Sequence, residues 1–196
     1  MEQEFKETLV RYLQTARDAL LWKLEGLEEY DVRRPLTPTG TNLLGLVKHC
    51  AWVEAGYFGE TFGRPFPEPA PWDLDDDVSV DPNVDLYAAE DESRDDLVDL
   101  YRRVQDWAAV TIESRDLDAP GRVPWWPEER NEVTLHQVLV HVATELHHHA
   151  GHADILRELL DGAVGLRPEV SNLPRDYDWP AHVARVETAA RAASEG

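Results

Sequence analysis

The sequence predicts an all-α protein, a bundle of four long helices, from three observations. In four separate stretches, apolar side chains recur every three or four residues, as they do on a helix with one buried face. No stretch shows the alternation of apolar and polar residues that is typical of a half-buried strand. Segments that contain proline and glycine separate the four stretches, so each stretch is expected to be one helix.

A short segment rich in helix breakers separates the first two helices. The first helix is expected over residues 4–30, where the helical rhythm continues throughout. Residues 33–40 contain two prolines and a glycine and should end it. Thr41 is the expected N-cap of the second helix, which should continue to about Gly59.

Two longer loops flank the third helix. Proline-rich residues 63–82 are expected to form an irregular loop, and such loops in compact domains are usually functional or disordered. The third helix is expected over about residues 82–114, and a second loop over residues 118–133. Thr134 can then cap the fourth helix, and Gly162 can adopt the left-handed conformation that ends one.

Length and composition indicate a single domain. At 196 residues, with 42% apolar content and seven tryptophans, the chain can build one substantial core. Residues 1–162 are expected to form the bundle. Residues 163–196, which include an alanine-rich helix from about Pro180, are expected to be a C-terminal extension packed on the same domain.

The formal net charge of -20 argues against several classes of partner. So acidic a protein repels phosphate backbones and anionic lipid surfaces, so neither nucleic acid nor a membrane is expected as a partner. The single cysteine, Cys50, excludes an intrachain disulfide. Residues 1–30 are too charged for a secretory signal or a membrane span, so the cytoplasm is the expected compartment.

The fourth helix carries the clearest functional signal. Five of the eight histidines and one carboxylate, Glu145, fall within residues 141–152. Glu145 and His149 are four residues apart, and His149 and His152 are three apart, so their side chains are neighbours on one helical surface. Imidazole and carboxylate groups at such spacing are typical ligands of a divalent first-row metal.

Helix geometry indicates which of these side chains point inward. Each residue of a helix is rotated by about 100° around the helix axis from the one before it. If the direction of His141 is taken as zero, the apolar side of the helix is centred at about 100°, Glu145 lies at about 40° and His149 at about 80°. Glu145 and His149 are therefore expected to face the bundle interior, and His147 to face outward. His141 and His152 lie at the boundary, where they can be further ligands, hydrogen-bond partners of the ligands or groups at a pocket mouth.

A third ligand is expected from the second helix. An ionised carboxylate that faces a core is costly unless it is paired, and no basic residue shares the face of Glu145. His49 lies at the edge of the apolar side of its own helix, from which it can enter the core. Three ligands, His49, Glu145 and His149, would leave one coordination position open, as in catalytic sites.

Plainer interpretations exist for each of these residues. The histidine run can be a solvated surface with one or two rings hydrogen-bonded in the core, and His49 can be such a core histidine. Cys50 is expected to be a small packing residue. Trp125 and Trp126 can stack on a substrate, but tryptophans in loops more often cover the end of a core.

Residues 141–162 resemble the mycothiol-transferase-like branch of the DinB superfamily, long catalogued as a domain of unknown function and related to the mycothiol-dependent maleylpyruvate isomerases. The resemblance covers nearly the whole chain, and it includes residues 43–54, Pro71, Trp72, residues 171–174 and Trp179. It implies an up-down-down-up four-helix bundle, frequently a homodimer, that binds a divalent metal. Zinc is the expected metal and nickel the alternative.

The resemblance also implies a ligand set. Members usually bind metal through one histidine of the second helix and a His-x-x-x-His pair on the last core helix. Here Glu145 replaces the first histidine of the pair, which implies the triad His49, Glu145 and His149, a variant seen in the maleylpyruvate isomerases. Residues 136–137 and 146–148 depart from the pattern of the branch, which leaves the metal ligands in place but affects any inherited substrate preference.

The first functional hypothesis is a metal-dependent transferase or isomerase that uses a low-molecular-weight, mycothiol-like thiol and an electrophilic small molecule. The metal would make the thiol a nucleophile at neutral pH. His152 and His141 are expected to orient a ligand or to move a proton. Asp154, Arg157 and Trp126 are the expected contacts of the thiol cosubstrate.

Two alternatives use the same ligands. One is a non-catalytic metal-binding protein, with a role in stress or in protein interaction, in which the metal fixes the second helix against the fourth. The other is metal-activated hydrolysis that needs no thiol. A thiol that changes the spectrum of the bound metal would favour the transferase over the non-catalytic protein.

Overall fold

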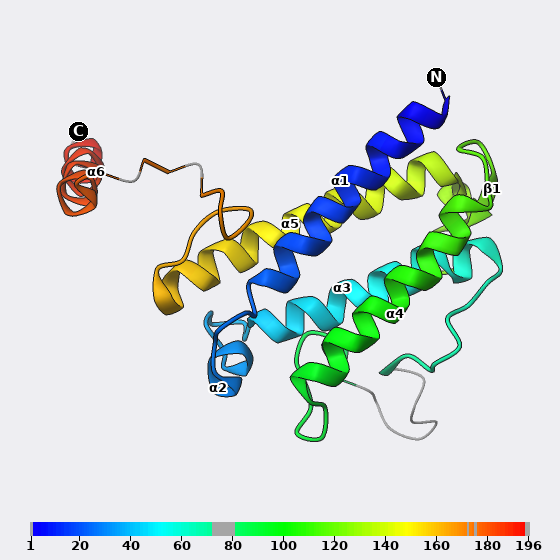
Figure 1. Cartoon of the computed structure of the whole chain (residues 1–196), viewed down its shortest axis with the longest axis horizontal. Helices are drawn as coiled ribbons and strands as arrows, with labels where there is room; N and C mark the ends of the chain where they lie inside the picture. The colour runs from blue at the N-terminus through cyan, green and yellow to red at the C-terminus, as the bar shows by residue number, and fades with distance from the viewer. Residues whose placement is uncertain (1, 72–80, 172, 175, 195–196) are drawn as a thin grey trace.

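The computed structural model describes residues 2–71, 81–171, 173–174 and 176–194. Four long helices form the bundle, and Figure 1 shows that α1 and α5 run in one direction whereas α3 and α4 run in the opposite direction. These helices are α1 (Glu2–Trp22), α3 (Leu43–Phe58), α4 (Arg94–Glu113) and α5 (Leu135–Asp161). The all-α bundle predicted from the sequence is therefore confirmed, and its helices have the up-down-down-up arrangement that the resemblance implies.

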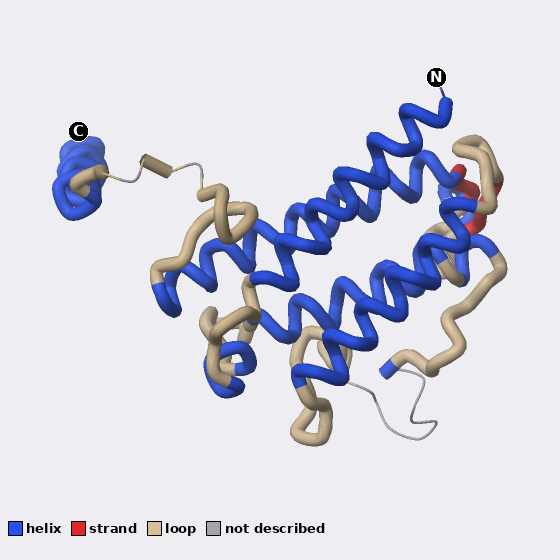
Figure 2. The backbone as a smooth tube through the Cα atoms, viewed as in Figure 1, coloured by secondary structure: helices blue, strands red, loops and turns tan. Residues whose placement is uncertain are grey.

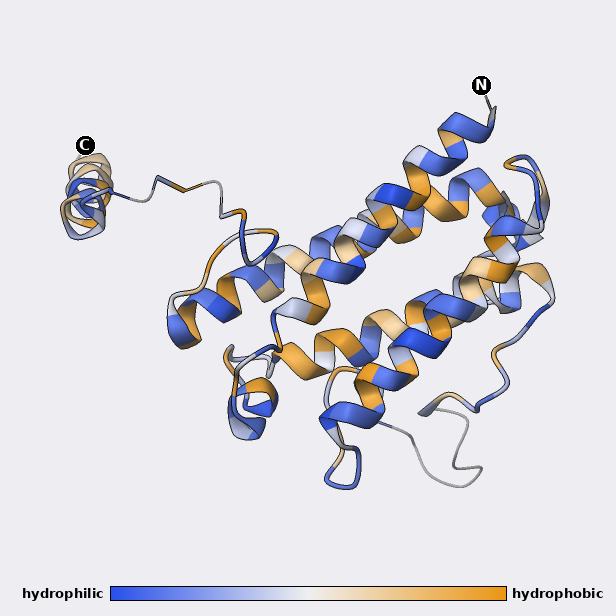
Figure 3. Ribbon diagram, viewed as in Figure 1, coloured by the Kyte–Doolittle hydropathy of each residue, from blue (hydrophilic) through white to orange (hydrophobic). Residues whose placement is uncertain are grey.

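Contacts between the long helices follow this arrangement. Helix α1 packs along α5, α3 packs along α4, and α3 also packs against α5. Figure 3 shows hydrophobic and hydrophilic residues in turn around α1 and α4, as expected for helices with one buried face, whereas most residues of α3 are buried because it packs against both α4 and α5. The contact between α3 and α5 matters most for function, because it brings the two predicted ligand-bearing helices together.

Short elements connect the long helices (Figure 2). Among the described residues, the helical ones are α2 (Glu29–Arg33), η1 (Glu60–Phe62) and η3 (Glu128–Arg130). Strands β1 (Pro120–Arg122) and β2 (Glu132–Thr134) pair antiparallel and form a small hairpin before α5. The sequence prediction contained no strand, because three residues are too few to show a strand pattern.

The predicted boundaries of the first and third helices are wrong. The first helix ends at Trp22 instead of residue 30, because Gly26 takes a left-handed conformation with φ of 73° and α2 follows as a separate turn. The third helix begins at Arg94 instead of residue 82, where the hydroxyl of Ser93 accepts a hydrogen bond from the backbone N–H of Asp96. An apolar rhythm alone does not reveal such breaks, since residues in loops can also pack on a core.

The second helix is capped by Asn42, not by Thr41. The side-chain oxygen of Asn42 accepts a hydrogen bond of 2.7 Å from the backbone N–H of Gly45, and its amide donates to the carbonyl of Leu86. A Cβ atom at Gly45 would lie 1.9 Å from that carbonyl oxygen. Gly45 therefore lets the segment before α4 cross the start of α3 closely, which places the neighbouring Asp85 near the middle of α3.

Helix α5 has the predicted ends. Thr134 caps its start in a reciprocal arrangement with Gln137, and Gly162 ends it with φ of 78°. Both signals are local, so the sequence contains all the information that fixes them. This helix is the frame on which two of the three predicted metal ligands lie.

An ionic cluster in which both charged residues are buried lies in the bundle core. The Arg17 guanidinium pairs with the Glu54 carboxylate, with Nε of Arg17 3.0 Å from Oε1 of Glu54. The Tyr101 hydroxyl donates to the same oxygen at 3.0 Å. All three residues are buried, and they join α1, α3 and α4. Removal of either charge would leave the other without its partner inside the core.

The chain beyond α5 leaves the bundle after a short contact with it. The Trp22 indole donates to the carbonyl of Leu166 at 2.8 Å, and Lys23 donates to the carbonyl of Gly165. Helix α6 (Trp179–Ser194) then stands apart from the bundle in Figure 1, and none of its described residues is buried. The expected packing of residues 163–196 on the bundle stays a prediction. Among the described helices, none has the length and apolar character needed to cross a membrane.

Candidate metal centre

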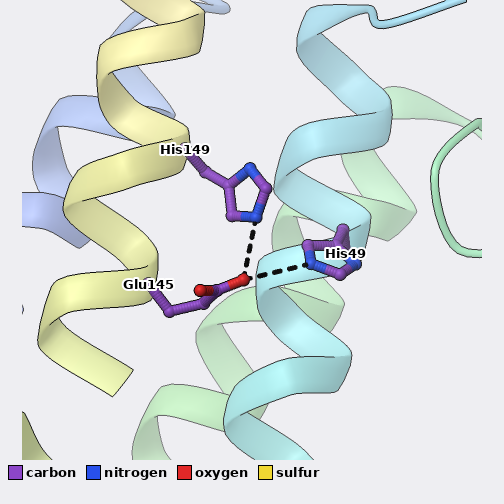
Figure 4. A group of neighbouring side chains, drawn as sticks. All are labelled: His49, Glu145 and His149. Carbon is purple, nitrogen blue, oxygen red and sulfur yellow. Dashed lines mark hydrogen bonds and ion pairs between the residues drawn. The ribbon is translucent and has the colours of Figure 1, made fainter. Parts of the chain in front are cut away.

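The three predicted metal ligands meet where α3 contacts α5. His49 lies midway along α3, and Glu145 and His149 lie on successive turns of α5. Oε1 of Glu145 is 3.1 Å from Nε2 of His149 and 3.9 Å from Nε2 of His49. One ligand atom from each residue lies within 4.8 Å of the other two (Figure 4). Two imidazole nitrogens and one carboxylate oxygen thus converge, and this donor set suits a divalent first-row metal.

The rigid packing of the two helices fixes this arrangement. Cys50 follows His49 directly and is fully buried, and Leu146 follows Glu145 and is also fully buried. Because Cys50 and Leu146 are packed in the core, the backbone positions of His49 and Glu145 beside them are fixed before any ligand binds. The site is therefore built on two helices and not on a mobile loop.

The site is more open than the sequence predicted. The exposed fraction of the side chain is 36% for Glu145, 21% for His49 and 13% for His149. Glu145 was expected to face the interior, but it lies at the edge of the core, where water still reaches it. The cost of keeping its charge is therefore smaller than expected, and a ligand can approach the triad from the exposed side.

His49 has a second carboxylate behind it. Its Nδ1 lies 2.7 Å from Oδ2 of Asp85, in the segment that crosses the start of α3. Burial alone would raise the pKa of Asp85, but the hydrogen bond and the attraction to His49 outweigh it and lower the pKa. With Nδ1 donating to Asp85, the lone pair of Nε2 faces the other two ligands. Carboxylates in this position orient a histidine toward a metal and make it a better ligand.

The sequence prediction missed Asp85. The residue lies in an irregular segment, 36 positions after His49, and nothing in its neighbourhood distinguishes it from the other acidic residues of the chain. Only the path of the backbone past Gly45 shows that it reaches His49.

Burial keeps the His149 ring neutral. Its pKa is lowered by burial first and by the nearby His49 second, although Glu145 acts in the opposite direction. A neutral imidazole carries the lone pair that a metal ligand needs. Nδ1 of His149 is buried and has no hydrogen-bond partner among the described residues.

His141 and Trp126, two further predicted site residues, share one partner. The Tyr57 hydroxyl accepts a hydrogen bond of 3.0 Å from Nε1 of Trp126 and lies 3.0 Å from Nε2 of His141. His141 is one helical turn before Glu145, so this aromatic group lies beside the triad along α5. The roles expected for His141 and Trp126 stay predictions.

His152 lies on the solvent side of the triad. The residue is exposed, and its ring centroid is 5.5 Å from that of His149 and 4.3 Å from that of His148. It is thus close enough to the site to act on a ligand there, and its role in proton transfer stays a prediction.

Asp154 and Arg157 hold α5 against the end of α1. Asp154 forms an ion pair of 2.5 Å with the buried Lys23, and Arg157 pairs with Asp161 at 2.7 Å. Arg157 also donates to the backbone carbonyls at the end of α1, including that of Glu25 at 2.8 Å. These contacts give both residues a structural role, whereas their predicted contact with a thiol stays a prediction.

Comparisons with known proteins give one result that bears on this site. A family model described as mycothiol-S-transferase matches residues 8–162, which include the four long helices almost completely and all three converging residues. A search of curated proteins found no match.

Proposed function

Because the chain belongs to the mycothiol-S-transferase family, we propose that it joins a mycothiol-like thiol to an electrophilic small molecule at a divalent metal. His49, Glu145 and His149 would hold the metal. The observation that carries this proposal is the convergence of the three donor atoms, with Asp85 behind His49. Zinc is the metal we expect and nickel the alternative, since both accept nitrogen and oxygen ligands.

The ligand set supports a catalytic site more than a closed structural one. Structural zinc sites in proteins have four protein ligands, whereas catalytic sites have three and keep one position for a substrate. Within the described residues, three side chains converge, and the partial exposure of Glu145 leaves one side accessible. A bound divalent metal would supply Lewis acidity that lowers the pKa of a coordinated thiol, so that its sulfur is nucleophilic at neutral pH.

The remaining residues would bind and orient. Asp85 would keep the His49 ring in place, and His152, on the exposed side, would take up the proton that the thiol loses. His141, held by the Tyr57 hydroxyl, and Trp126 would form the wall on which the cosubstrate lies. The side chain of Asp154 is partly exposed beside Lys23 and would contact the polar groups of the thiol. Arg157 would contribute indirectly, because its hydrogen bond to the carbonyl of Lys23 helps to hold α5 in place.

A spectroscopic titration tests the proposal. Cobalt replaces the metal, and a small thiol is added while the visible spectrum is recorded. We expect a change that saturates at one thiol per metal. No change would indicate a closed site and favour the non-catalytic metal-binding protein, and turnover of an ester or amide without thiol would favour hydrolysis. Glu145→Ala is the control, because it should abolish the cobalt spectrum itself.

A further inference from the structure

We propose that a cavity beside the metal ligands binds the electrophile and selects an uncharged molecule with a planar aromatic group. This inference rests on the proposed function for the identity of the reaction, but the cavity and its ligand can be tested without it. The cavity has a volume of about 320 Å³. That is near the lower end of the usual range for small-molecule sites, roughly 300 to 1,000 Å³, and suits a substituted one- or two-ring compound.

The cavity adjoins the triad. Its floor includes Val53 and Gly56 of α3, which follow His49 at intervals of four and three residues and so lie on the same face of the helix. Asp85, the hydrogen-bond partner of His49, also lines it. A molecule in the cavity would therefore lie one helical turn from a metal ligand, where a thiol held at the metal could reach it.

Aromatic side chains form the walls. Trp52, Tyr57 and Trp125 line the cavity, and the rings of Tyr57 and Trp125 pack edge to face at 5.1 Å between centroids. Such walls favour a flat aromatic ligand, because ring stacking adds to the burial of apolar surface.

Gly56 fixes the position of Trp125. A Cβ atom at Gly56 would lie 2.9 Å from Cη2 of Trp125, so the end of the indole rests on the bare backbone of α3. Trp125 is nevertheless 49% exposed, which leaves surface on which a ligand can stack. The tryptophan thus has a defined place and still offers part of its surface to a ligand.

The charges of the lining select against anions. Glu60 and Asp85 contribute two carboxylates, and no lysine or arginine is among the described residues that line the cavity. The net charge of the chain, -20, acts in the same direction. An electrophile that carries a carboxylate should therefore bind more weakly than its uncharged counterpart.

A haloarene illustrates the reaction. The thiol loses its proton to a base, the sulfur forms a bond to the ring carbon, and the carbon–chlorine bond breaks as chloride leaves with the electron pair. No oxidant or reductant is needed. 4-Chloro-3,5-dinitrobenzamide and 4-chloro-3,5-dinitrobenzoate form a matched pair for this reaction, because they share the reacting carbon and both nitro groups and differ mainly in charge.

Binding is measured first, with compounds that cannot react. We titrate the metal-free protein with 1,3-dinitrobenzene and with 3,5-dinitrobenzoate in a calorimeter, because an open zinc position would itself bind the carboxylate. The uncharged compound should bind at least about tenfold more tightly, and Trp125→Ala should weaken its binding by about tenfold through the loss of stacking. Trp179→Ala, which removes an exposed tryptophan of α6 outside the cavity, should change nothing.

A second variant guards against indirect effects. Gly56→Ala adds the Cβ atom that would displace the Trp125 ring, so it should weaken 1,3-dinitrobenzene binding while the helical circular dichroism is kept. Equal affinity for the two compounds, or unchanged affinity in both Trp125→Ala and Gly56→Ala, would overturn the proposal.

Turnover of the matched chloro compounds with mycothiol then separates this inference from the proposed function. Faster turnover of the uncharged compound, with a KM raised by Trp125→Ala, supports both. Turnover with a preference for the benzoate would overturn the cavity assignment and leave the thiol transferase intact. Selective binding of 1,3-dinitrobenzene without any turnover would support the cavity and overturn the transferase.

Discussion

Two glutamates in the bundle, Glu54 on α3 and Glu145 on α5, have opposite surroundings. Glu54 is fully buried, pairs with the Arg17 guanidinium and accepts a hydrogen bond from Tyr101. Glu145 is partly exposed, and the groups nearest its carboxylate are the imidazoles of His49 and His149. The first carboxylate has a cation supplied by the chain itself. The second has only nitrogen groups whose lone pairs are suited to a metal.

The difference separates a structural charge from a functional one. The Glu54 cluster is complete, so any further ligand there would have to displace a buried pair. The Glu145 cluster is incomplete, because the lowered pKa of His149 keeps that ring uncharged near neutral pH. A divalent cation would complete it in the way that Arg17 completes the other. The first three predictions below each change one cluster and leave the other as it is.

The largest expected effect on stability comes from Glu54→Ala. Because Arg17 would stay buried without a partner, the free energy of unfolding should fall by about 3–5 kcal/mol. Urea unfolding followed by circular dichroism measures this. Glu68→Ala is the matched control, since its pair with Arg103 is exposed and should contribute less than about 1 kcal/mol. Similar losses in the two variants would contradict the structural role of the Glu54 cluster.

Glu145→Ala should weaken metal binding and leave the fold stable. The metal-free protein should stay folded, because Glu145 is at the edge of the core, while the affinity for zinc should fall by more than roughly 100-fold, beyond the loss typical of an outer partner. Competition with a chromophoric chelator measures the affinity. His147→Ala is the control, since the His147 ring donates to the carbonyl of its own helix at Ala143. Strong metal binding by Glu145→Ala, with loss of binding in His147→Ala, would mean that other histidines hold the metal.

Asp85→Asn tests the partner behind His49. Asparagine keeps an acceptor for Nδ1–H of His49 but loses the negative charge, so zinc affinity should fall by about tenfold, the lower part of the range for such partners. The same competition assay measures it, with Asp81→Asn in the same segment as the control. An unchanged affinity would show that Asp85 only helps to pack the loop.

The smallest effect concerns Cys50, which lies between the two clusters on α3. Burial raises the pKa of its thiol well above the usual range, and the charges of Glu54 and Glu145 raise it further. The thiolate fraction should therefore stay low as the pH rises past about 8.5, the ordinary cysteine value. Native protein should resist a disulfide reagent at pH 9, whereas guanidinium-unfolded protein should react fully. Rapid labelling of the native protein would show that the thiol is accessible.

The sequence was sufficient to predict the helix that carries most of the site. Thr134 and Gly162 act within one turn of α5, and the spacing of Glu145 and His149 is a property of any helix. His49 could be predicted because it lies at the edge of the apolar residues of its own predicted helix. These features depend on short-range geometry, which a single sequence contains.

Features that depend on how distant segments meet could not be predicted. Asp85 reaches His49 because the chain passes close to Gly45. This crossing has no local signal in the sequence. The exposure of Glu145 depends on the distance between α3 and α5, so helix angles alone overestimated its burial.

The most direct test of this account is a crystal structure of the zinc-loaded protein, with anomalous scattering recorded at the zinc edge. We expect one anomalous peak bonded to Nε2 of His49, a carboxylate oxygen of Glu145 and Nε2 of His149, with solvent or a thiol at the remaining position. If zinc is present in excess and these three side chains are only hydrogen-bonded to one another, with no anomalous peak between them, the metal centre proposed here does not exist.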